Sequence, residues 1–389
     1  MRRQLMTPRP NYQHKLEEIG LSFHAWDNYW CEDVAYVFNE SQIDEIEAAT
    51  QTLHSMCLAA VAYVIEHDLL DRFMIPSAFH PLIKQSFQDK EPSLYGRFDL
   101  AFDGKNPPKM LEYNADTPTS LLESAVAQWY WMQEQQPDAD QFNSLHEKLV
   151  DRWPSMNIEG KVHFASLAGN EEDWVCTHYL MDTALQAGLS VEHIDLEDIG
   201  VAQTESGACV FVDVDNQPIL NLFKLYPWEW LMREEFADTI VKQPLFPNDP
   251  DLATRWIEPV WKSILSCKAI LPVLWQLYPE HPNLLPAYFQ DDERAKQLTS
   301  FAKKPLYSRE GANVSLVENQ RIVCEDTGPY GEEGFVYQAL AAMPVYDGYY
   351  PVLGSWVVAD QAAGLCIRED VSPITTNMSR FVPHFFVKE

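Results

Sequence analysis

The sequence predicts a mixed α+β fold in which helices and strands follow one another irregularly. Three observations predict it: polar and apolar residues alternate over residues 95–114, apolar residues recur at helical spacing over 41–70, and strand candidates crowd the last 90 residues. The 389 residues, 46% hydrophobic, are enough to bury a sizeable core. Interrupted strand and helix order favours α+β over a doubly wound sheet. No internal repeat or flexible linker is apparent, so we expect the units to pack as one body.

Residues 41–70 are expected to form the first long helix. Ser41 can cap it, and Asp44 and Glu45 would lie in its first turn. The apolar residues at helical spacing are Ile43, Ile46, Leu53, Met56 and Val61. The longest uninterrupted apolar run, residues 56–65, is too short to span a bilayer.

Residues 95–114 are expected to form an antiparallel hairpin around the turn at 104–108 (Gly-Lys-Asn-Pro-Pro). If the register centres on that turn, Asp99 lies opposite Glu112 and Arg97 opposite Asn114. Like charges directly opposite one another destabilise a hairpin. We therefore expect a positive partner for the two acids, and a divalent metal with a phosphate beside Arg97 is the natural candidate.

The middle of the chain is expected to be α/β. Residues 119–135 look helical, and Ser120 with Glu123 has capping-box spacing. A strand at 161–167, a helix at 177–187 and a strand at 190–194 would form one α/β unit. Further expected elements are a second hairpin from 210–213 and 219–224, amphipathic helices at 228–237 and 256–266, a loop at 243–252, and strands at 302–306, 313–318, 321–325, 335–339, 352–359 and 364–368.

Charge and cysteine content exclude several classes of partner and site. The chain carries 58 acidic and 28 basic side chains, a formal net charge of −30, which repels nucleic acid and anionic membranes. Its seven cysteines are scattered singly, without a Cys-x-x-Cys pair, which argues against a disulfide framework or a structural zinc site. The N-terminus lacks the apolar segment of a signal peptide. These features favour a cytoplasmic protein.

The strongest candidate site is the polar face of the expected hairpin, with Arg97, Asp99, Glu112 and Asn114. Carboxylate and amide oxygens suit magnesium, which usually keeps some water and binds substrate phosphates as well. Arginine makes bidentate contacts with phosphate and keeps its proton. The alternative is an ordinary solvated hairpin face with an Arg–Asp pair.

Other candidates are weaker on their own. Lys304 followed by Ser-Arg-Glu-Gly-Ala (308–312) could form a loop that closes over phosphates, although by itself a basic turn of this kind favours an ordinary exposed hairpin. Lys268 begins an apolar stretch and could simply reach solvent. Arg368 could form a salt bridge at a strand end. The acidic run that includes Glu172 and Asp173 could attract an amine or be a solvated loop, and Thr117 and Ser120 could contact a substrate carboxylate or cap a helix. No Walker A motif and no Ser/His/Asp or Cys/His grouping at a recognisable spacing occurs in the sequence.

Eight ordered motifs together resemble a known family. They are Tyr-Gly-Arg-Phe-Asp (95–99), Leu-Glu-Tyr-Asn-Ala-Asp-Thr-Pro-Thr-Ser (111–120), Lys-Ala-Ile-Leu-Pro (268–272), Pro-Asn-Leu-Leu (282–285), Lys-Pro-Leu-Tyr-Ser-Arg-Glu-Gly (304–311), Val-Tyr-Gln (336–338), Gly-Ser-Trp (354–356) and Ile-Arg-Glu-Asp (367–370). Collinear over nearly the whole chain, they resemble the synthetase domain of glutathionylspermidine synthase, and most of all its stand-alone bacterial relatives described as acid–amine ligases.

The resemblance implies an ATP-grasp-like fold with an N-terminal pre-ATP-grasp-like α/β portion. It implies one synthetase unit over 1–389, with a metal and phosphate hairpin at about 95–120, a substrate-side portion at 161–240 and a nucleotide-binding portion at 256–389. The bifunctional members carry an amidase domain, for which there is no room before residue 95, so product hydrolysis is not expected.

The resemblance also implies residue roles and a reaction. Asp99, Glu112 and Asn114 would hold two Mg²⁺ ions, and Arg97 would stabilise the transferring phosphate. The other implied ATP-binding residues are Phe98, Lys268, Lys304, Gly311, Ala312, Gln338 and Arg368. A carboxylate would attack the ATP γ-phosphorus, and an amine would displace phosphate from the acyl phosphate.

The substrates are small molecules that the sequence does not identify, and the oligomeric state stays open. Glutathione and spermidine are in doubt as substrates because Thr117 to Ser120 departs from the family's serine-rich stretch. One competing hypothesis is a nucleotide-binding protein without ligase activity. A more distant one is a hydrolase that uses Asp99 and Glu112 as its carboxylate pair.

Overall fold

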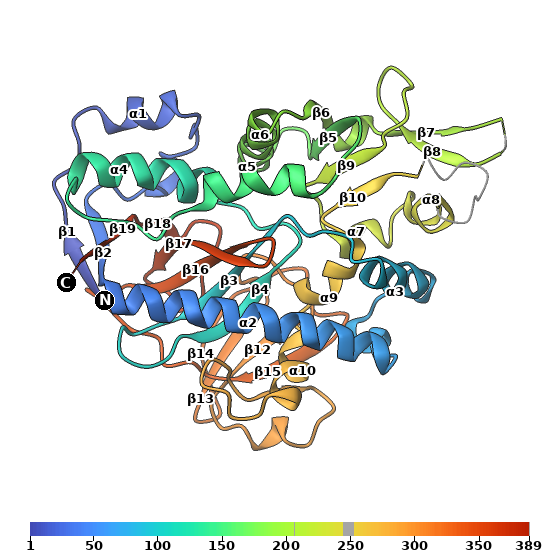
Figure 1. The fold of residues 1–389 in the computed structure, drawn as a ribbon. Helices are drawn as coiled ribbons and strands as arrows, with labels where there is room; N and C mark the ends of the chain where they lie inside the picture. Colours follow the sequence, from blue (N-terminus) through green and yellow to red (C-terminus); the bar gives the residue numbers. More distant parts are fainter. Residues whose placement is uncertain (206, 244–252, 389) are drawn as a thin grey trace.

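The fold is organised around a central antiparallel sheet that contains the expected hairpin (Figure 1). The computed structural model describes residues 1–205, 207–243 and 253–388. The strand order is β18 (Arg380–Phe381), β17 (Gln361–Asp370), β16 (Tyr350–Val358), β3 (Tyr95–Ala101) and β4 (Lys109–Asn114). The hairpin register is confirmed, because Asp99 pairs with Glu112 and Arg97 with Asn114. A bulge follows Asp99, where the pairing shifts by one residue.

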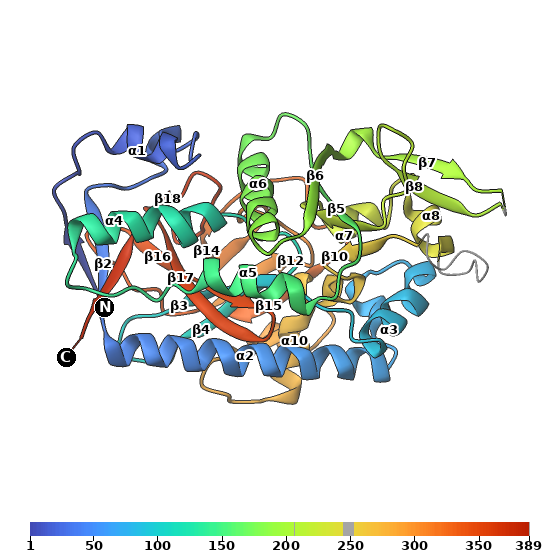
Figure 2. The same ribbon diagram turned by 45° about the horizontal axis from the view of Figure 1, so that its top comes forward.

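Helices cover both faces of this central sheet, and each face has its own apolar core (Figures 1 and 2). On one face lies α2 (Glu40–Glu66), packed on Phe98, Leu100 and Leu353. On the other lie the π-helix η4 (Glu123–Ala127), α4 (Gln128–Gln135) and α5 (Leu145–Ser155), packed around Trp356. The strand alternation therefore buries one set of residues under α2 and turns Arg97 and Asp99 toward the opposite face.

Helix α2 confirms the expected long helix but begins differently. Its N-cap is Asn39 and not Ser41. The Asn39 side chain accepts a hydrogen bond from the backbone NH of Gln42, and the Gln42 side chain accepts one from the backbone NH of Asn39. By length and composition α2 is long and apolar enough to cross a membrane, unlike the shorter run considered above. However, 56% of that apolar stretch is buried inside the fold, as in a core helix.

Residues 121–135 are helical, so the helix begins two residues later than expected, and the expected capping box at Ser120 does not form. Ser120 has a positive φ of 71°, and its hydroxyl lies 3.2 Å from the hydroxyl of Tyr29. The Glu123 side chain also bonds Tyr29, at 2.5 Å, instead of reaching back to the helix start. A five-residue π-helical turn begins at Glu123 and disrupts the regular helical ladder there.

A four-stranded parallel sheet forms the second unit and confirms the α/β prediction. Its order is β10 (Arg255–Ile257), β9 (Asn221–Lys224), β5 (Lys161–Ser166) and β6 (Ser190–Asp195). The helix between β5 and β6 is α6 (Glu171–Gln186), which begins earlier than expected because Asn170 caps it and acidic residues fill its first turn.

Four expectations in this region were wrong, were only partly met or are untested. The second hairpin forms only next to its turn, where Val212 bridges Pro218 and the Ile219 NH donates to the Phe211 carbonyl. Beyond this, β8 (Cys209–Val212) pairs with β7 (Gly200–Gln203), whereas β9 joins the parallel sheet. The helix expected at 256–266 is instead β10, the 3₁₀ turn η8 (Val260–Lys262) and the short α9 (Ser263–Ser266). The helix expected at 228–237 is reduced to α7 (Trp228–Leu231), with α8 (Ala237–Lys242) after it. The loop expected at 243–252 lies, apart from residue 243, outside the described residues.

The C-terminal strands are confirmed. A five-stranded antiparallel sheet has the order β11 (Ala287–Phe289), β15 (Phe335–Ala339), β12 (Phe301–Pro305), β13 (Ser315–Glu318) and β14 (Arg321–Glu325). It lies below α2 in Figure 1, and α10 (Ile270–Leu277) packs between α2 and this sheet. The two remaining expected strands, near 352 and 364, are β16 and β17 of the central sheet.

Both chain ends meet in a three-stranded sheet of order β1 (Arg2–Leu5), β2 (Val34–Asn39) and β19 (His384–Val387). The remaining described elements are α1 (Tyr12–Glu18), η1 (Trp26–Asn28), η2 (Leu70–Phe73), η3 (Ser77–Phe79), α3 (His80–Gln88), η5 (Leu196–Asp198) and η9 (Ala295–Gln297). Mixed helix and strand content of this kind agrees with the expected α+β class.

Candidate active site

The polar face of the hairpin carries a connected set of charges. The Arg97 guanidinium donates to both carboxylate oxygens of Asp99, at 2.8 and 3.4 Å, and to the carbonyl of Thr119 at 2.9 Å. The Asn114 amide donates to Asp99 at 3.0 Å and to Glu112 at 3.5 Å. Two acids, one arginine and one amide therefore converge within hydrogen-bond distance of one another.

A glycine on the neighbouring strand makes room for Arg97. Gly354 of β16 pairs with Asp99, and a Cβ at this position would lie 2.8 Å from Cδ and 3.2 Å from Nε of Arg97. Such a Cβ would also collide with the sulfur of Cys366. The Gly-Ser-Trp motif thus lets the arginine lie flat against the sheet, with the Trp356 ring 5.5 Å from its guanidinium.

Two lysines from distant segments approach Glu112. Lys268, just before α10, places Nζ 3.2 Å from Glu112 Oε2, and Lys304 of β12 bonds the carbonyl of Leu111 at 2.9 Å. Burial alone would raise the pKa of Glu112, but the ammonium groups of Lys268 and Lys304 lower this pKa to about 2. Burial lowers the pKa of Lys304 to about 8. The carboxylate of Glu112 is therefore ionised at neutral pH.

Gln338 of β15 completes this side of the site. Its side-chain oxygen accepts from Lys304 at 2.9 Å, and its amide nitrogen donates to the carbonyl of Met110 at 3.0 Å. These bonds tie the hairpin to the C-terminal five-stranded sheet. Gln338 and Lys304 also line a cavity of about 110 Å³ whose walls are largely apolar and include Leu316 and Ile374.

A loop crosses over the hairpin face at residues 308–311. Its Gly311 has a φ of 73°, and a Cβ there would lie 2.7 Å from the carbonyl oxygen of Thr375, so only glycine fits this close approach. Lys268 Nζ donates to the carbonyl of Ser308 at 2.9 Å and fixes the start of the loop.

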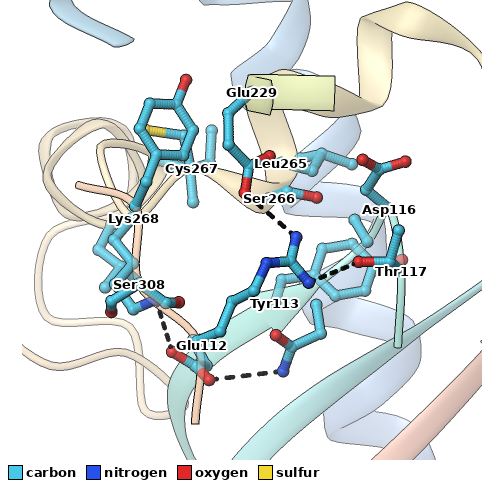
Figure 3. A pocket seen from close by; sticks show the side chains of 16 residues that line it. Glu112, Tyr113, Asp116, Thr117, Glu229, Leu265, Ser266, Cys267, Lys268 and Ser308 are labelled. Atoms are coloured by element: carbon cyan, nitrogen blue, oxygen red, sulfur yellow. Dashed lines mark hydrogen bonds and ion pairs between the residues drawn. The ribbon is translucent and has the colours of Figure 1, made fainter. Parts of the chain in front are cut away.

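The loop also contributes a residue that the sequence did not single out. Arg309 donates to the Thr117 hydroxyl at 2.8 Å and to Glu229 at 3.1 Å, as Figure 3 shows at the pocket that these residues line. Arg309 belongs to a motif already noted, so charge and motif together could have found it. Nothing in the sequence marks Glu229, which lies in a segment expected to be an ordinary amphipathic helix.

Next to the apolar cavity, along the same face of the hairpin, is a larger and more polar cavity of about 300 Å³. Glu172 and Asp173, in the first turn of α6, face it together with Thr117 and Arg368. Burial, and then the neighbouring charge of Glu172, raise the pKa of Asp173 to about 7. Arg368 of β17 donates to the carbonyls of Ser379, Thr376 and Asn377 at 2.8 to 3.2 Å.

The two cavities share part of their lining: Asp99, Glu112, Ser308, Gly311 and Thr375 border both. The hairpin acids therefore stand between an apolar cavity under the C-terminal sheet and an acidic cavity beside α6. A molecule held in one cavity could present a reacting group at the acids to a molecule held in the other.

Three residues expected at the site have side chains outside these cavity linings. Phe98 is fully buried and its ring stacks on Tyr113 at 3.8 Å, so only its backbone is near the site. Ser120 is 1% exposed and its hydroxyl lies 3.2 Å from that of Tyr29, so its side chain lines neither cavity. Ala312 follows the loop but lines neither cavity, and its backbone NH donates to the Arg309 carbonyl.

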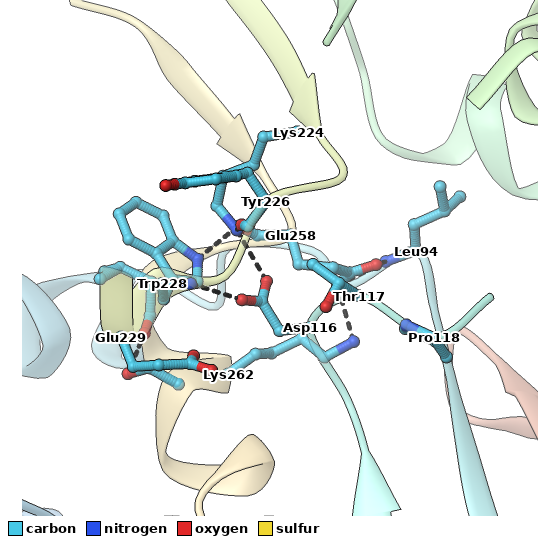
Figure 4. A network of polar contacts seen from close by, with 12 residues as sticks. Leu94, Asp116, Thr117, Pro118, Lys224, Tyr226, Trp228, Glu229, Glu258 and Lys262 are labelled. Carbon is cyan, nitrogen blue, oxygen red and sulfur yellow. Dashed lines mark hydrogen bonds and ion pairs between the residues drawn. The ribbon is translucent and has the colours of Figure 1, made fainter. Parts of the chain in front are cut away.

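Behind the site lies a buried ion pair that the sequence analysis missed (Figure 4). Asp116 accepts from Lys224 Nζ at 2.8 Å and from the backbone NH of Trp228 at 2.7 Å, and both charged side chains are almost fully buried. Asp116 immediately precedes Thr117, and Trp228 immediately precedes Glu229. The pair therefore positions the two residues that hold Arg309.

The donor set at the hairpin suits a hard cation. Asp99, Glu112 and Asn114 offer carboxylate and amide oxygens, as Mg²⁺ prefers, and the low pKa of Glu112 keeps its ligand form available.

Comparison with known proteins gives one consistent result. Residues 3–387 match the sequence family described as "Glutathionylspermidine synthase preATP-grasp". A Haemophilus influenzae protein described as "Putative acid--amine ligase" is 43% identical over 97% of this chain and 98% of its own length. The trypanothione synthetase of Crithidia fasciculata and the bifunctional glutathionylspermidine synthetase/amidase of Escherichia coli are each 30% identical, over 93% and 91% of this chain. This chain spans only 56% and 59% of those two proteins.

Among solved structures, a glutathione synthetase-like effector from Globodera pallida in its apo form superposes with a TM-score of 0.54. The superposition covers 98% of this chain at 11% identity, so the likeness concerns the fold alone.

Proposed function

The chain belongs to the glutathionylspermidine synthase family, and from this membership and the site geometry we propose that it is an ATP- and Mg²⁺-dependent carbon–nitrogen ligase. It would join a small-molecule carboxylate to an amine through an acyl phosphate. The carboxylate could be a glutathione-like peptide and the amine a polyamine. The single observation that carries the proposal is the hairpin face, on which Arg97, Asp99, Glu112 and Asn114 converge at the border of two cavities.

The apolar cavity under the C-terminal sheet is the proposed nucleotide site of an ATP-grasp-like fold. Gln338 lies beside the cavity walls where the base would bind, and Lys304 and Lys268 lie between the cavity and the hairpin. These two cations, with the backbone of Gly311, would hold the phosphates. Glu112, which pairs with Lys268 in this structure, would give up that lysine to serve as a metal ligand.

The reaction requires positioning and charge neutralisation rather than a protein nucleophile. Two Mg²⁺ ions held by Asp99, Glu112 and Asn114 would neutralise the charge on the phosphates. Burial alone would lower the pKa of Arg97, but neighbouring charges, above all that of Asp99, raise this pKa further above its usual range. Arg97 therefore stays cationic. Arg97 would contact the transferring phosphate as the substrate carboxylate attacks the γ-phosphorus. Arg368 would contact a phosphate oxygen from β17, which is two strands away from β3 in the central sheet.

The acidic cavity is the proposed place for the acceptor amine. Glu172 and Asp173 give it negative charge, and Thr117 offers a hydroxyl at the boundary with the hairpin. Asp173, with its pKa near 7, could accept a proton from an ammonium group, which would make the amine nucleophilic for attack on the acyl phosphate. We also propose a cytoplasmic location, in keeping with the reliance on ATP.

The test measures ADP release that depends on both an acid and an amine, over a panel of peptides and polyamines. Arg97→Ala and Glu112→Ala should abolish it, and Lys304→Met should weaken ATP binding. Lys303→Met is the matched control, because Lys303 precedes Lys304 on β12 but packs on the Phe335 ring, 3.9 Å away, outside both cavities. Undiminished turnover in the Arg97 or Glu112 variant would refute the assigned roles. ATP binding without ADP release across the panel would instead favour a binding protein.

A further inference from the structure

A histidine of the parallel sheet has no hydrogen-bond partner for either of its ring nitrogens. His163 lies on β5 and is 3% exposed, and both Nδ1 and Nε2 are buried without a partner that satisfies hydrogen-bond geometry. Leaving buried polar atoms without partners is costly, and such atoms call for an explanation. In its neutral form an imidazole offers a lone pair that can bind a metal ion.

Two carboxylates face this ring from different elements. Asp213, after β8, lies with Oδ2 3.4 Å from His163 Nε2, and Glu192 of β6 lies with Oε2 3.9 Å from the same atom. One ligand atom from each of the three residues lies within 4.8 Å of the others. In the described part of the chain this is the one such group of three histidine, cysteine or carboxylate side chains.

The aspartate is held in place by its own turn. Its Oδ1 accepts from the backbone NH groups of Asp215 and Gln217, at 3.0 and 2.8 Å, which leaves Oδ2 directed at the histidine. Asp213 is 7% exposed, whereas the Glu192 side chain is 40% exposed and pairs with Lys161 at the surface. The group thus has two buried, positioned members and one movable member at the solvent side.

The spacing suits a small divalent cation. Bonds of about 2.0–2.1 Å at tetrahedral angles separate two ligand atoms by roughly 3.3 Å, which is the His163–Asp213 separation within a tenth of an ångström or so. Glu192 would need to approach by about half an ångström and exchange its exposed lysine for the ion. Three protein ligands, one of them imidazole, leave a position for water and favour zinc-like transition metals over magnesium.

We propose that His163, Glu192 and Asp213 form a binding site for a divalent transition metal ion, separate from the hairpin acids. His163 and Glu192 are the third residues of β5 and β6, whereas the α6 acids of the active site follow the carboxyl end of β5. A metal here would join β5, β6 and the turn after β8, and would stabilise the parallel sheet.

The experiment uses the full chain without nucleotide and measures zinc binding by competition with a chromophoric chelator, with cobalt absorption as a second readout. We expect one zinc per chain bound at this site, an affinity at least about tenfold weaker in His163→Gln and Glu192→Gln, and unchanged affinity in Glu112→Gln. Zinc should also raise the unfolding temperature of the wild type but not of His163→Gln. Glu192→Gln keeps the test valid if the His163 variant fails to fold, because Glu192 is at the surface.

His178→Gln is the matched control, since His178 lies on α6 and stacks on Trp174 outside the cluster. Absence of zinc binding by the wild type, or equal binding by the wild type and both cluster variants, would overturn the proposal. Loss of zinc binding in Glu112→Gln alone would assign the ion to the active site and would also overturn it. The ligase proposal is tested separately by ADP release, so either proposal can fail alone.

Discussion

Replacing Asp116 by asparagine should destabilise the protein strongly, because it breaks the buried ion pair behind the active site. The Lys224 and Asp116 side chains are 0% and 1% exposed, so the buried lysine would lose the one carboxylate it pairs with directly and keep only the more distant charges of Glu229 and Glu258. Its other contacts are the Tyr226 carbonyl at 2.7 Å and the Trp228 ring at 4.6 Å. Asparagine would also turn an NH₂ group toward either the ammonium or the Trp228 NH, both of which are donors.

The loss of unfolding free energy in Asp116→Asn has an upper bound, because Lys224 can lose its proton instead of staying charged and unpaired. Breaking a buried pair costs about 3–5 kcal/mol. A lysine with an ordinary pKa of about 10.4 can instead lose its proton at pH 7 for about 4.6 kcal/mol, since one pKa unit is about 1.36 kcal/mol. We therefore expect Asp116→Asn to lower the free energy of unfolding by about 4 kcal/mol at pH 7.

The same reasoning predicts how the loss depends on pH. Burial already lowers the pKa of Lys224, and without Asp116 the folded-state pKa falls further below that of the unfolded chain. The unfolded variant then binds more protons, so its stability rises with pH relative to the wild type. At pH 9 the proton-loss bound is only about 1.9 kcal/mol, and the gap between the two proteins should shrink accordingly.

Urea unfolding at pH 7, 8 and 9 measures both quantities. Asp238→Asn is the control, because it removes the aspartate of an exposed Lys–Asp pair on α8 and should leave the unfolding midpoint unchanged. A loss below about 1.5 kcal/mol at pH 7, or a gap that stays constant to pH 9, would refute the view that an uncompensated lysine charge dominates.

Three further predictions concern the site and its surroundings. Gly354→Ala should reduce ADP release, because the new Cβ would lie 2.8 Å from Cδ of Arg97, and overpacking should cost about 1–3 kcal/mol in urea unfolding; unchanged kinetics would contradict the close packing. ATP affinity, measured by calorimetry, should fall as the pH rises through about 8, where Lys304 loses its proton, and this pH dependence should be absent in Lys304→Met. Burial raises the pKa of Glu123 to about 7, although Tyr29 donates a hydrogen bond to it. The contribution of Glu123 to the free energy of unfolding should therefore be highest below about pH 4.5 and should fall as the pH rises to 7, because the unfolded chain loses this proton first. Glu123→Gln should remove this fall, up to about 3 kcal/mol, in a stability profile from pH 4 to 8.

The hairpin was predictable from the sequence because its information is local. Turn residues set the register, and alternation then placed Arg97 and Asp99 on one face, as the pairing in the structure confirms. Alternation along β12 likewise places the neighbouring Lys303 and Lys304 on opposite faces of that strand. The sequence-based roles of these side chains stay predictions, although the structure gathers most of them around two adjoining cavities.

The errors arose where local pattern does not determine the partner. Residues 219–224 form a strand as expected, but Asn221 pairs with Val162 of β5 and not with the preceding strand. The segment at 256–266 has helical composition, yet its first residues add an edge strand to the parallel sheet. The contact between Arg309 and Glu229 joins segments 80 residues apart, which alternation and spacing do not reveal.

The small sheet at the chain ends affects the order in which the protein can fold. Strand β2 pairs with β1 from the first residues of the chain and, in parallel, with β19 from the last. During synthesis β2 therefore waits for some 340 residues before its second neighbour emerges from the ribosome. Until then Tyr36 and Phe38 lack the strand that covers them, and the nascent chain exposes an unpaired edge beside α2. Formation of this sheet therefore waits until nearly all of the described residues have been synthesised, and chaperone binding to this edge would protect the chain in the interval.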